Sequence, residues 1–150
     1  NGEHSIQECD SVTRETLKNL FNELDLINIY YPGVILKPSM VISGDKNSKR
    51  ADYDSVAEMT IMCLKDMCPE DLGGIAFLSG GQSNDEATNH LNIMNSGKFD
   101  LPWRVTFSYA RAIQQSALNT WSGKDENHDK AQSILAERAK LCSQSSIGKN

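Results

Sequence analysis

The stretch IAFLSGG at residues 75–81 carries an apolar run directly into a serine and two glycines. Such a run predicts a short buried strand, and the glycines predict a sharp turn where the strand ends. The residues SNDE at 83–86 follow, and a serine with a glutamate three positions later is typical of a capping box that begins a helix. The stretch therefore predicts a strand, a glycine turn and a helix in immediate succession.

Strand and helix patterns alternate along the rest of the chain. Two more apolar runs, at 34–37 and 103–109, predict strands. Helices are expected at roughly 5–27, from 52 onward, at 83–97, from 110 onward and at 126–142. Strands that alternate with helices favour right-handed crossovers and a parallel sheet with both faces covered. We therefore expect an α/β fold in which residues 1–150 form a single domain.

The composition argues against several classes of function. The formal net charge of −5 and the pI near 5.1 argue against a nucleic-acid binder, which needs a basic face. No apolar run approaches the ~20 residues of a membrane-spanning helix, and the N-terminus lacks the pattern of a secretory signal. The four cysteines include no CxxC pair, so we expect a reduced, metal-free protein of the cytoplasm.

Residues that can bind or react follow all three predicted strands. In parallel α/β folds, ligands gather at the carboxyl ends of the strands. The residues at those ends are Lys37, then Ser79, Gly80 and Gly81, then Ser108 and Arg111. We therefore treat the three strand ends as parts of one candidate site.

Lys37 ends the apolar run GVIL and is followed at once by Pro38. Two interpretations of this lysine stay open from the stretch alone. It is either a surface charge that reaches water at the end of a strand, the commoner fate of a lone lysine, or a nucleophile in a dry site. In the second case desolvation would lower the pKa of the amine, and the neutral amine could attack a carbonyl group.

The other two strand ends suit an anion. In LSGGQS, glycines without a Cβ let backbone N–H groups approach an anion closely, although a plain glycine turn has the same sequence. In FSYAR, Arg111 stands at a helix start, where its guanidinium and free N–H groups could meet a phosphate. Anion donors after two successive strands are typical of the phosphate site of a (β/α)8 barrel. Together they predict a phosphorylated ligand that faces Lys37.

Four motifs carry a resemblance that covers nearly all of the chain: ILKPSMV, GIAFLSGGQSNDEATNHLN, PWRVTFSYARAIQQSALNTW and GKDENHDKAQ. In this order and spacing they resemble the carboxyl-terminal half of class I fructose-bisphosphate aldolases. The resemblance implies a partial (β/α)8 TIM barrel, about its last three strands with their helices. It also implies a glycolytic lyase that reversibly cleaves fructose 1,6-bisphosphate to dihydroxyacetone phosphate and glyceraldehyde 3-phosphate through a Schiff base.

The resemblance also implies roles for individual residues. Lys37 matches the Schiff-base lysine, and positions that bind a substrate phosphate are matched by Ser79, Gly80, Ser108 and Arg111. No metal or other cofactor is implied, because the protonated imine itself stabilises the carbanion. The partners implied are a phosphorylated sugar and further copies of the protein in a homotetramer.

The chain departs from the family pattern at two positions near these residues. Pro32 stands where glutamate is usual, and Ala110 stands where glycine is usual. A methyl group at Ala110 could crowd a backbone contact with phosphate if that contact needs an unusual backbone angle.

Three strands cannot close an eight-stranded barrel, which typically takes ~250 residues. The acid/base carboxylates that the family carries on its earlier strands also have no counterparts in this sequence. We therefore expect the chain to be incomplete as an enzyme and inactive alone. The alternative is a truncated, divergent aldolase-like protein that binds or scaffolds without catalysis.

Overall fold

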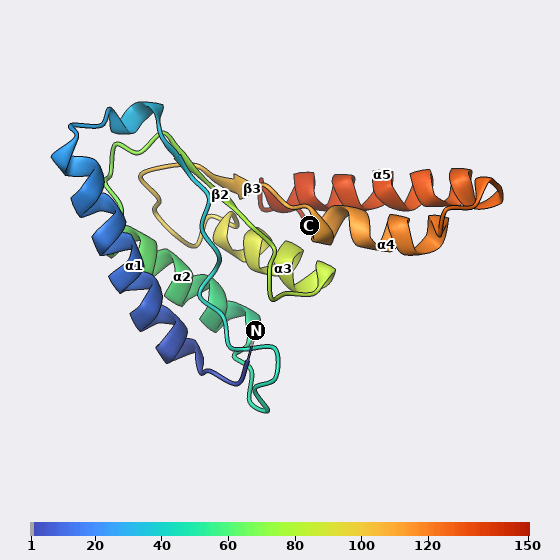
Figure 1. The fold of residues 1–150 in the computed structure, drawn as a ribbon, viewed down its shortest axis with the longest axis horizontal. Helices are drawn as coiled ribbons and strands as arrows, with labels where there is room; N and C mark the ends of the chain where they lie inside the picture. The colour runs from blue at the N-terminus through green and yellow to red at the C-terminus, as the bar shows by residue number, and fades with distance from the viewer. Residues whose placement is uncertain (1) are drawn as a thin grey trace.

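The computed structural model describes residues 2–150, and its helices and strands follow in the predicted order (Figure 1). The helices are α1 (Ile6–Leu26), α2 (Tyr53–Met67), α3 (Asn84–Met94), α4 (Arg111–Trp121) and α5 (His128–Ser145). The strands are β1 (Ile35–Leu36), β2 (Gly74–Phe77) and β3 (Val105–Phe107). Two short 3-10 helices are also present: η1 (Tyr31–Gly33), where the sequence predicts no helix, and η2 (Asp125–Asn127), at the start of the helix predicted at 126–142. All the predicted helices and strands are present, and the strands are shorter than the apolar runs.

Three helices begin at side chains that satisfy their first backbone N–H groups. Ser5 and Ser83 each form a capping box with the glutamate three residues later, at the starts of α1 and α3. Asp52 accepts a hydrogen bond from the backbone N–H of Ser55 at the start of α2. The helix starts are therefore defined locally by the sequence, as the SNDE motif predicts for α3.

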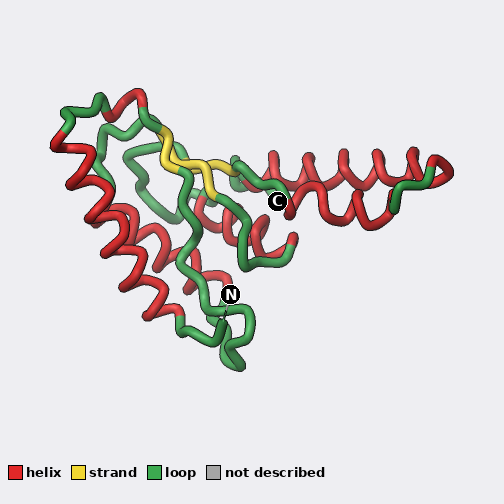
Figure 2. Tube along the Cα trace, viewed as in Figure 1, coloured by secondary structure: helices red, strands yellow, loops and turns green. Residues whose placement is uncertain are grey.

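The strands form a parallel sheet in the order β1-β2-β3 (Figure 2). The register aligns Leu36 with Ile75 and Ile75 with Val105, so these side chains form one row on one face. Ile75 is only 1% exposed, and the row belongs to the same apolar core as Leu64 of α2 and Leu91 of α3. Burial of this row between the sheet and the helices contributes to the apolar stabilisation of the fold.

The opposite face of the sheet is open within residues 2–150. Ile35 of β1 is 69% exposed, and Thr106 of β3 is exposed as well. The prediction that both faces of the sheet are covered is therefore wrong for this part of the chain. A sheet of three strands cannot curve round far enough to enclose its own inner face, so these side chains stay in solvent.

The last two helices form an antiparallel pair that extends beyond β3 (Figure 1). Ala117 of α4 and Ala131 of α5 are buried where the helices face each other. The end of the chain returns to α3, where the backbone N–H of Asn150 donates to Oδ1 of Asn92. None of the helices in residues 2–150 is both long and apolar enough to cross a lipid bilayer.

Candidate functional site

The turn after β2 brings two glycines to the start of α3. Gly81 has a φ of +79°, in the left-handed region that favours glycine. A Cβ at Gly80 would lie 3.2 Å from Nη2 of Arg111, so the guanidinium rests directly against the backbone of this glycine. The structure therefore brings together Gly80 and Arg111, two of the residues that the sequence singles out.

Ser79 is also part of this arrangement, because it contacts the start of α4. Ala110, the residue before α4, offers no side-chain oxygen to the first N–H groups of this helix. Ser79 Oγ takes that role from the turn after β2, because it accepts a hydrogen bond of 3.4 Å from the backbone N–H of Ala112. Ser79 is only 6% exposed. We call Ser79, Gly80, Gly81, Arg111 and Ala112 the Gly80–Arg111 corner.

A hollow of about 370 Å³ opens in front of the Gly80–Arg111 corner. Gly80, Gly81 and Arg111 line one side of it, and His4 and Cys9 reach it from the start of α1. The exposed guanidinium of Arg111 presents N–H donors at this hollow. The hollow can therefore take a small anion such as a phosphate group.

Lys37 lies at a neighbouring hollow of about 580 Å³, between α1 and the end of β1. The two hollows share His4, Cys9 and Ser39 in their linings, so they adjoin. Lys37 is exposed, and the residues of this chain do not enclose it in a dry site. We call Ile35–Ser39, together with the facing side of α1, the β1 edge.

Ser108 lies between the corner and β3. Its backbone N–H donates a hydrogen bond of 2.8 Å to the carbonyl oxygen of Phe77, which extends the pairing of β2 with β3 by one step. The side chain of Ser108 is exposed at the carboxyl end of the strand. It is therefore accessible to a ligand at the predicted edge of the sheet.

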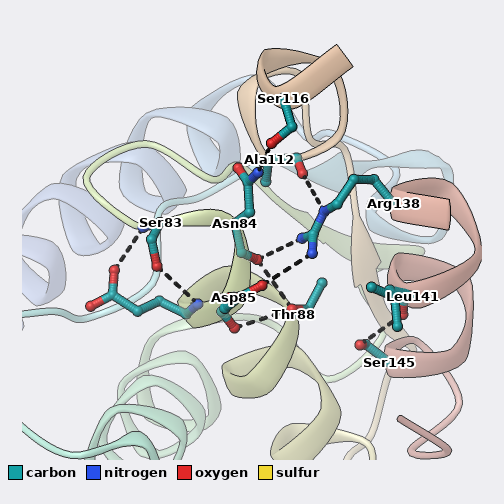
Figure 3. Close-up of polar contacts among 10 residues, drawn as sticks. Ser83, Asn84, Asp85, Thr88, Ala112, Ser116, Arg138, Leu141 and Ser145 are labelled. Atoms are coloured by element: carbon teal, nitrogen blue, oxygen red, sulfur yellow. Dashed lines mark hydrogen bonds and ion pairs between the residues drawn. The ribbon is translucent and has the colours of Figure 1, made fainter. Parts of the chain in front are cut away.

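Arg138 of α5 lies next to the Gly80–Arg111 corner, where it contacts the starts of α3 and α4. Its guanidinium bonds the carbonyl oxygens of Asn84 and Ala112 and pairs with Asp85 (Figure 3). Sequence reasoning missed this residue. The available signal was its position in the buried stripe of α5, seven residues after Ala131.

His90 of α3 is buried beside the turn that holds the glycines. Its Nδ1 lies 2.6 Å from Oε1 of Gln82, and its ring meets the Tyr53 ring edge-on. Burial lowers the pKa of His90 to about 4, against a smaller opposing effect of Glu86. His90 is therefore a neutral core residue at pH 7. Within residues 2–150, no group of three or more His, Cys, Asp and Glu side chains could hold a metal ion.

Both departures from the family pattern fit the local backbone. Ala110 has a φ of −100°, which any L-amino acid adopts, so its methyl group causes no backbone strain. Pro32 lies in the first turn of η1, where the φ of proline suits the helix and its missing N–H group is not needed.

Comparison with known proteins identifies the family of the chain. The family model for fructose-bisphosphate aldolase class-I matches residues 1–150. The probable fructose-bisphosphate aldolase class 1 of Xanthomonas campestris pv. campestris is 49% identical over 150 residues, which are 99% of this chain and 44% of that protein. The cytosolic fructose-bisphosphate aldolase 6 of Arabidopsis thaliana is 42% identical over 147 residues, which are 98% of this chain and 41% of that protein.

A solved structure supports the same assignment. Fructose-bisphosphate aldolase from Plasmodium falciparum, in a complex with TRAP and a small molecule inhibitor, matches with a TM-score of 0.92 and 41% identity. The match covers 99% of this chain and 43% of that one, so the chain spans less than half the length of its relatives. The predicted α/β fold, a partial (β/α)8 barrel with three parallel strands, is confirmed. The chain belongs to the class I fructose-bisphosphate aldolase family.

Proposed function

We propose that the protein carries part of the active site of a fructose-bisphosphate aldolase that acts in glycolysis in the cytoplasm. In this proposal Lys37 is the Schiff-base lysine, and the phosphate of the substrate is bound by Ser79, Gly80, Ser108 and Arg111. The observation that carries the proposal is the contact of the Arg111 guanidinium with the Gly80 backbone, beside a hollow at the carboxyl ends of parallel strands.

The proposed chemistry begins at the amine of Lys37. Its neutral form attacks the ketone carbon of the sugar, water leaves, and the protonated imine then stabilises the carbanion formed when the carbon–carbon bond breaks. Cleavage also needs a positioned acid/base group. The relatives are more than twice as long as the matched stretch, and we expect this group in their additional length, as well as the contacts of a homotetramer.

Non-catalytic binding of a phosphorylated ligand is the second candidate. The observation that favours it is the contrast between Arg111, which lies against Gly80 beside a hollow, and Lys37, which is exposed. A chain with a formed anion site and an unenclosed lysine could bind a sugar phosphate without reacting with it.

Reductive trapping separates the two candidates. The full-length polypeptide that carries these residues is incubated with dihydroxyacetone phosphate, reduced with borohydride and digested for mass spectrometry. We expect an adduct at Lys37 that is absent in Lys37→Met and kept in Lys130→Met, a control on the exposed side of α5. Phosphate-dependent binding without any adduct would favour the non-catalytic candidate.

The phosphate site is tested by Arg111→Ala. Loss of a charge-assisted hydrogen bond should weaken dihydroxyacetone phosphate binding roughly tenfold or more. The thermal midpoint should change little, because Arg111 is exposed. Unchanged affinity in a folded variant would refute the assignment of this residue.

A further inference from the structure

Arg138 is the charged side chain that holds the Gly80–Arg111 corner from behind. It is only 8% exposed and reaches from α5 toward the first turns of α3 and α4 (Figure 3). Its Nε donates to the carbonyl oxygen of Ala112 at 3.1 Å, and its Nη2 donates to that of Asn84 at 2.8 Å. Its Nη1 pairs with Oδ1 of Asp85 at 3.1 Å. One guanidinium therefore bridges two helix starts.

Each of these two helix starts carries one half of the corner. The turn with Gly80 and Gly81 leads directly into α3, whose first residues are Asn84 and Asp85. Arg111 begins α4, and the next residue, Ala112, bonds both Arg138 and Ser79. The distance between the glycine turn and the Arg111 guanidinium therefore depends on how far α3 lies from α4. Arg138 spans this distance.

The hydrogen bonds of Arg138 to two carbonyl oxygens matter more for the position of the helix starts than its ion pair with Asp85 does. The Asp85 carboxylate is 81% exposed, and ion pairs to such exposed groups contribute little to stability. The two carbonyl oxygens are instead held by the planar fork of the guanidinium, which a lysine cannot reproduce. A second link runs between the same helices, because Nδ2 of Asn84 donates to Oγ of Ser116 at 2.8 Å.

We propose that Arg138 is a positioning residue for the phosphate site: it sets the separation of the α3 and α4 starts and thereby the affinity of the Gly80–Arg111 corner for the phosphate of the substrate. This inference rests on the proposed function of the corner. It assigns no contact with substrate to Arg138, which lies on the far side of Ala112 from Ser79.

The test compares a ketose with and without phosphate in the full-length polypeptide. Borohydride trapping at Lys37 is titrated with dihydroxyacetone phosphate and with dihydroxyacetone. In Arg138→Met the half-saturating concentration of the phosphate ester should rise roughly tenfold, because small misplacements of binding groups are costly. Trapping by dihydroxyacetone should stay unchanged. Arg138→Lys, which keeps the charge and loses the fork, should behave like Arg138→Met.

Two controls separate positioning from loss of stability. Asp85→Asn removes the exposed ion pair and should leave phosphate affinity within about twofold. Val56→Ala makes a cavity in the buried face of α2, away from the corner, and should lower the thermal midpoint without changing either titration. Equal weakening with both ketoses, or weakening in Val56→Ala, would overturn the positioning role.

A double variant shows whether Arg138 acts through Arg111. If it does, Arg111→Ala combined with Arg138→Met binds the phosphate ester no more weakly than Arg111→Ala alone. Independent losses that multiply would overturn the inference and leave the proposed function intact. If neither single variant changes the affinity of the folded protein, the phosphate site itself is wrongly placed and the proposed function fails.

Discussion

The Gly80–Arg111 corner and the β1 edge are neighbours in space and differ in how completely this chain builds them. At the corner, the bond from Ala112 to Ser79 joins α4 to the turn after β2, and Arg138 of α5 bridges the starts of α3 and α4. At the edge, Ile35 is 69% exposed and Lys37 faces a hollow of about 580 Å³. The corner is thus held by hydrogen bonds within residues 2–150, whereas the same residues leave Lys37 exposed.

The largest expected difference is between the β1 edge and the buried side of β2, the strand that leads into the corner, and it is measured with isoleucine at both places. Ile75→Ala removes a side chain that is 1% exposed and leaves a cavity between the sheet and the helices. It should lower the free energy of unfolding by roughly 2–5 kcal/mol. Ile35→Ala removes an exposed side chain from the 150-residue chain and should change it by less than about 0.5 kcal/mol. Urea unfolding of both variants measures the difference.

The Ile35→Ala measurement also shows whether the β1 edge is covered in solution. A cost for Ile35→Ala that matches the cost for Ile75→Ala would show that something covers β1, such as a second copy of the chain. Repeating the measurement at several protein concentrations separates these cases, because only an intermolecular contact makes the cost depend on concentration.

The next largest effect is expected from pH and concerns His90 beside the corner. Burial lowers the pKa of His90 to about 4, from 6.5 in the absence of the fold. The unfolded chain therefore binds this proton more readily than the folded one. The contribution of neutral His90 to the free energy of unfolding is complete above pH 6.5. It is lost as the pH falls toward 4, by about 3 kcal/mol in total.

Substitution isolates this contribution. In His90→Asn the free energy of unfolding should fall much less between pH 7 and pH 4 than it does in the original chain. His128→Asn, at an exposed position on α5, should keep the full pH dependence. Urea unfolding at three pH values is sufficient. An unchanged slope in His90→Asn would mean that another buried group is responsible.

The sequence predicts most of the fold and only part of the site. Local signals such as the capping box at Ser83 and the apolar run before Gly80 are sufficient for the element order. Exposure of Ile35 was not predictable, because it depends on how many strands surround it. The bonds of Arg138 were missed because they join residues 26 and 54 positions apart, and no local pattern carries that information.

The smallest expected effect comes from removing a helix cap. The same capping box occurs next to both regions, so the two substitutions can be compared directly. At the start of α1 the Glu8 N–H lies 3.2 Å from Ser5 Oγ, and at the start of α3 the Glu86 N–H lies 3.2 Å from Ser83 Oγ. Ser5→Ala and Ser83→Ala should therefore each lower the free energy of unfolding by about 1 kcal/mol. Their effects on ligand binding should differ.

Only Ser83→Ala should weaken the trapping of dihydroxyacetone phosphate at Lys37, because fraying of α3 loosens the glycine turn that precedes it. Glu86 also pairs with Arg50 at 2.6 Å, and Arg50 reaches the Gly81 carbonyl oxygen, so loss of the cap disturbs a second support of the turn. Equal weakening in Ser5→Ala would instead place the start of α1 in the phosphate site. His4 already lines that hollow, so the two regions would then form one continuous site whose halves cannot be altered separately.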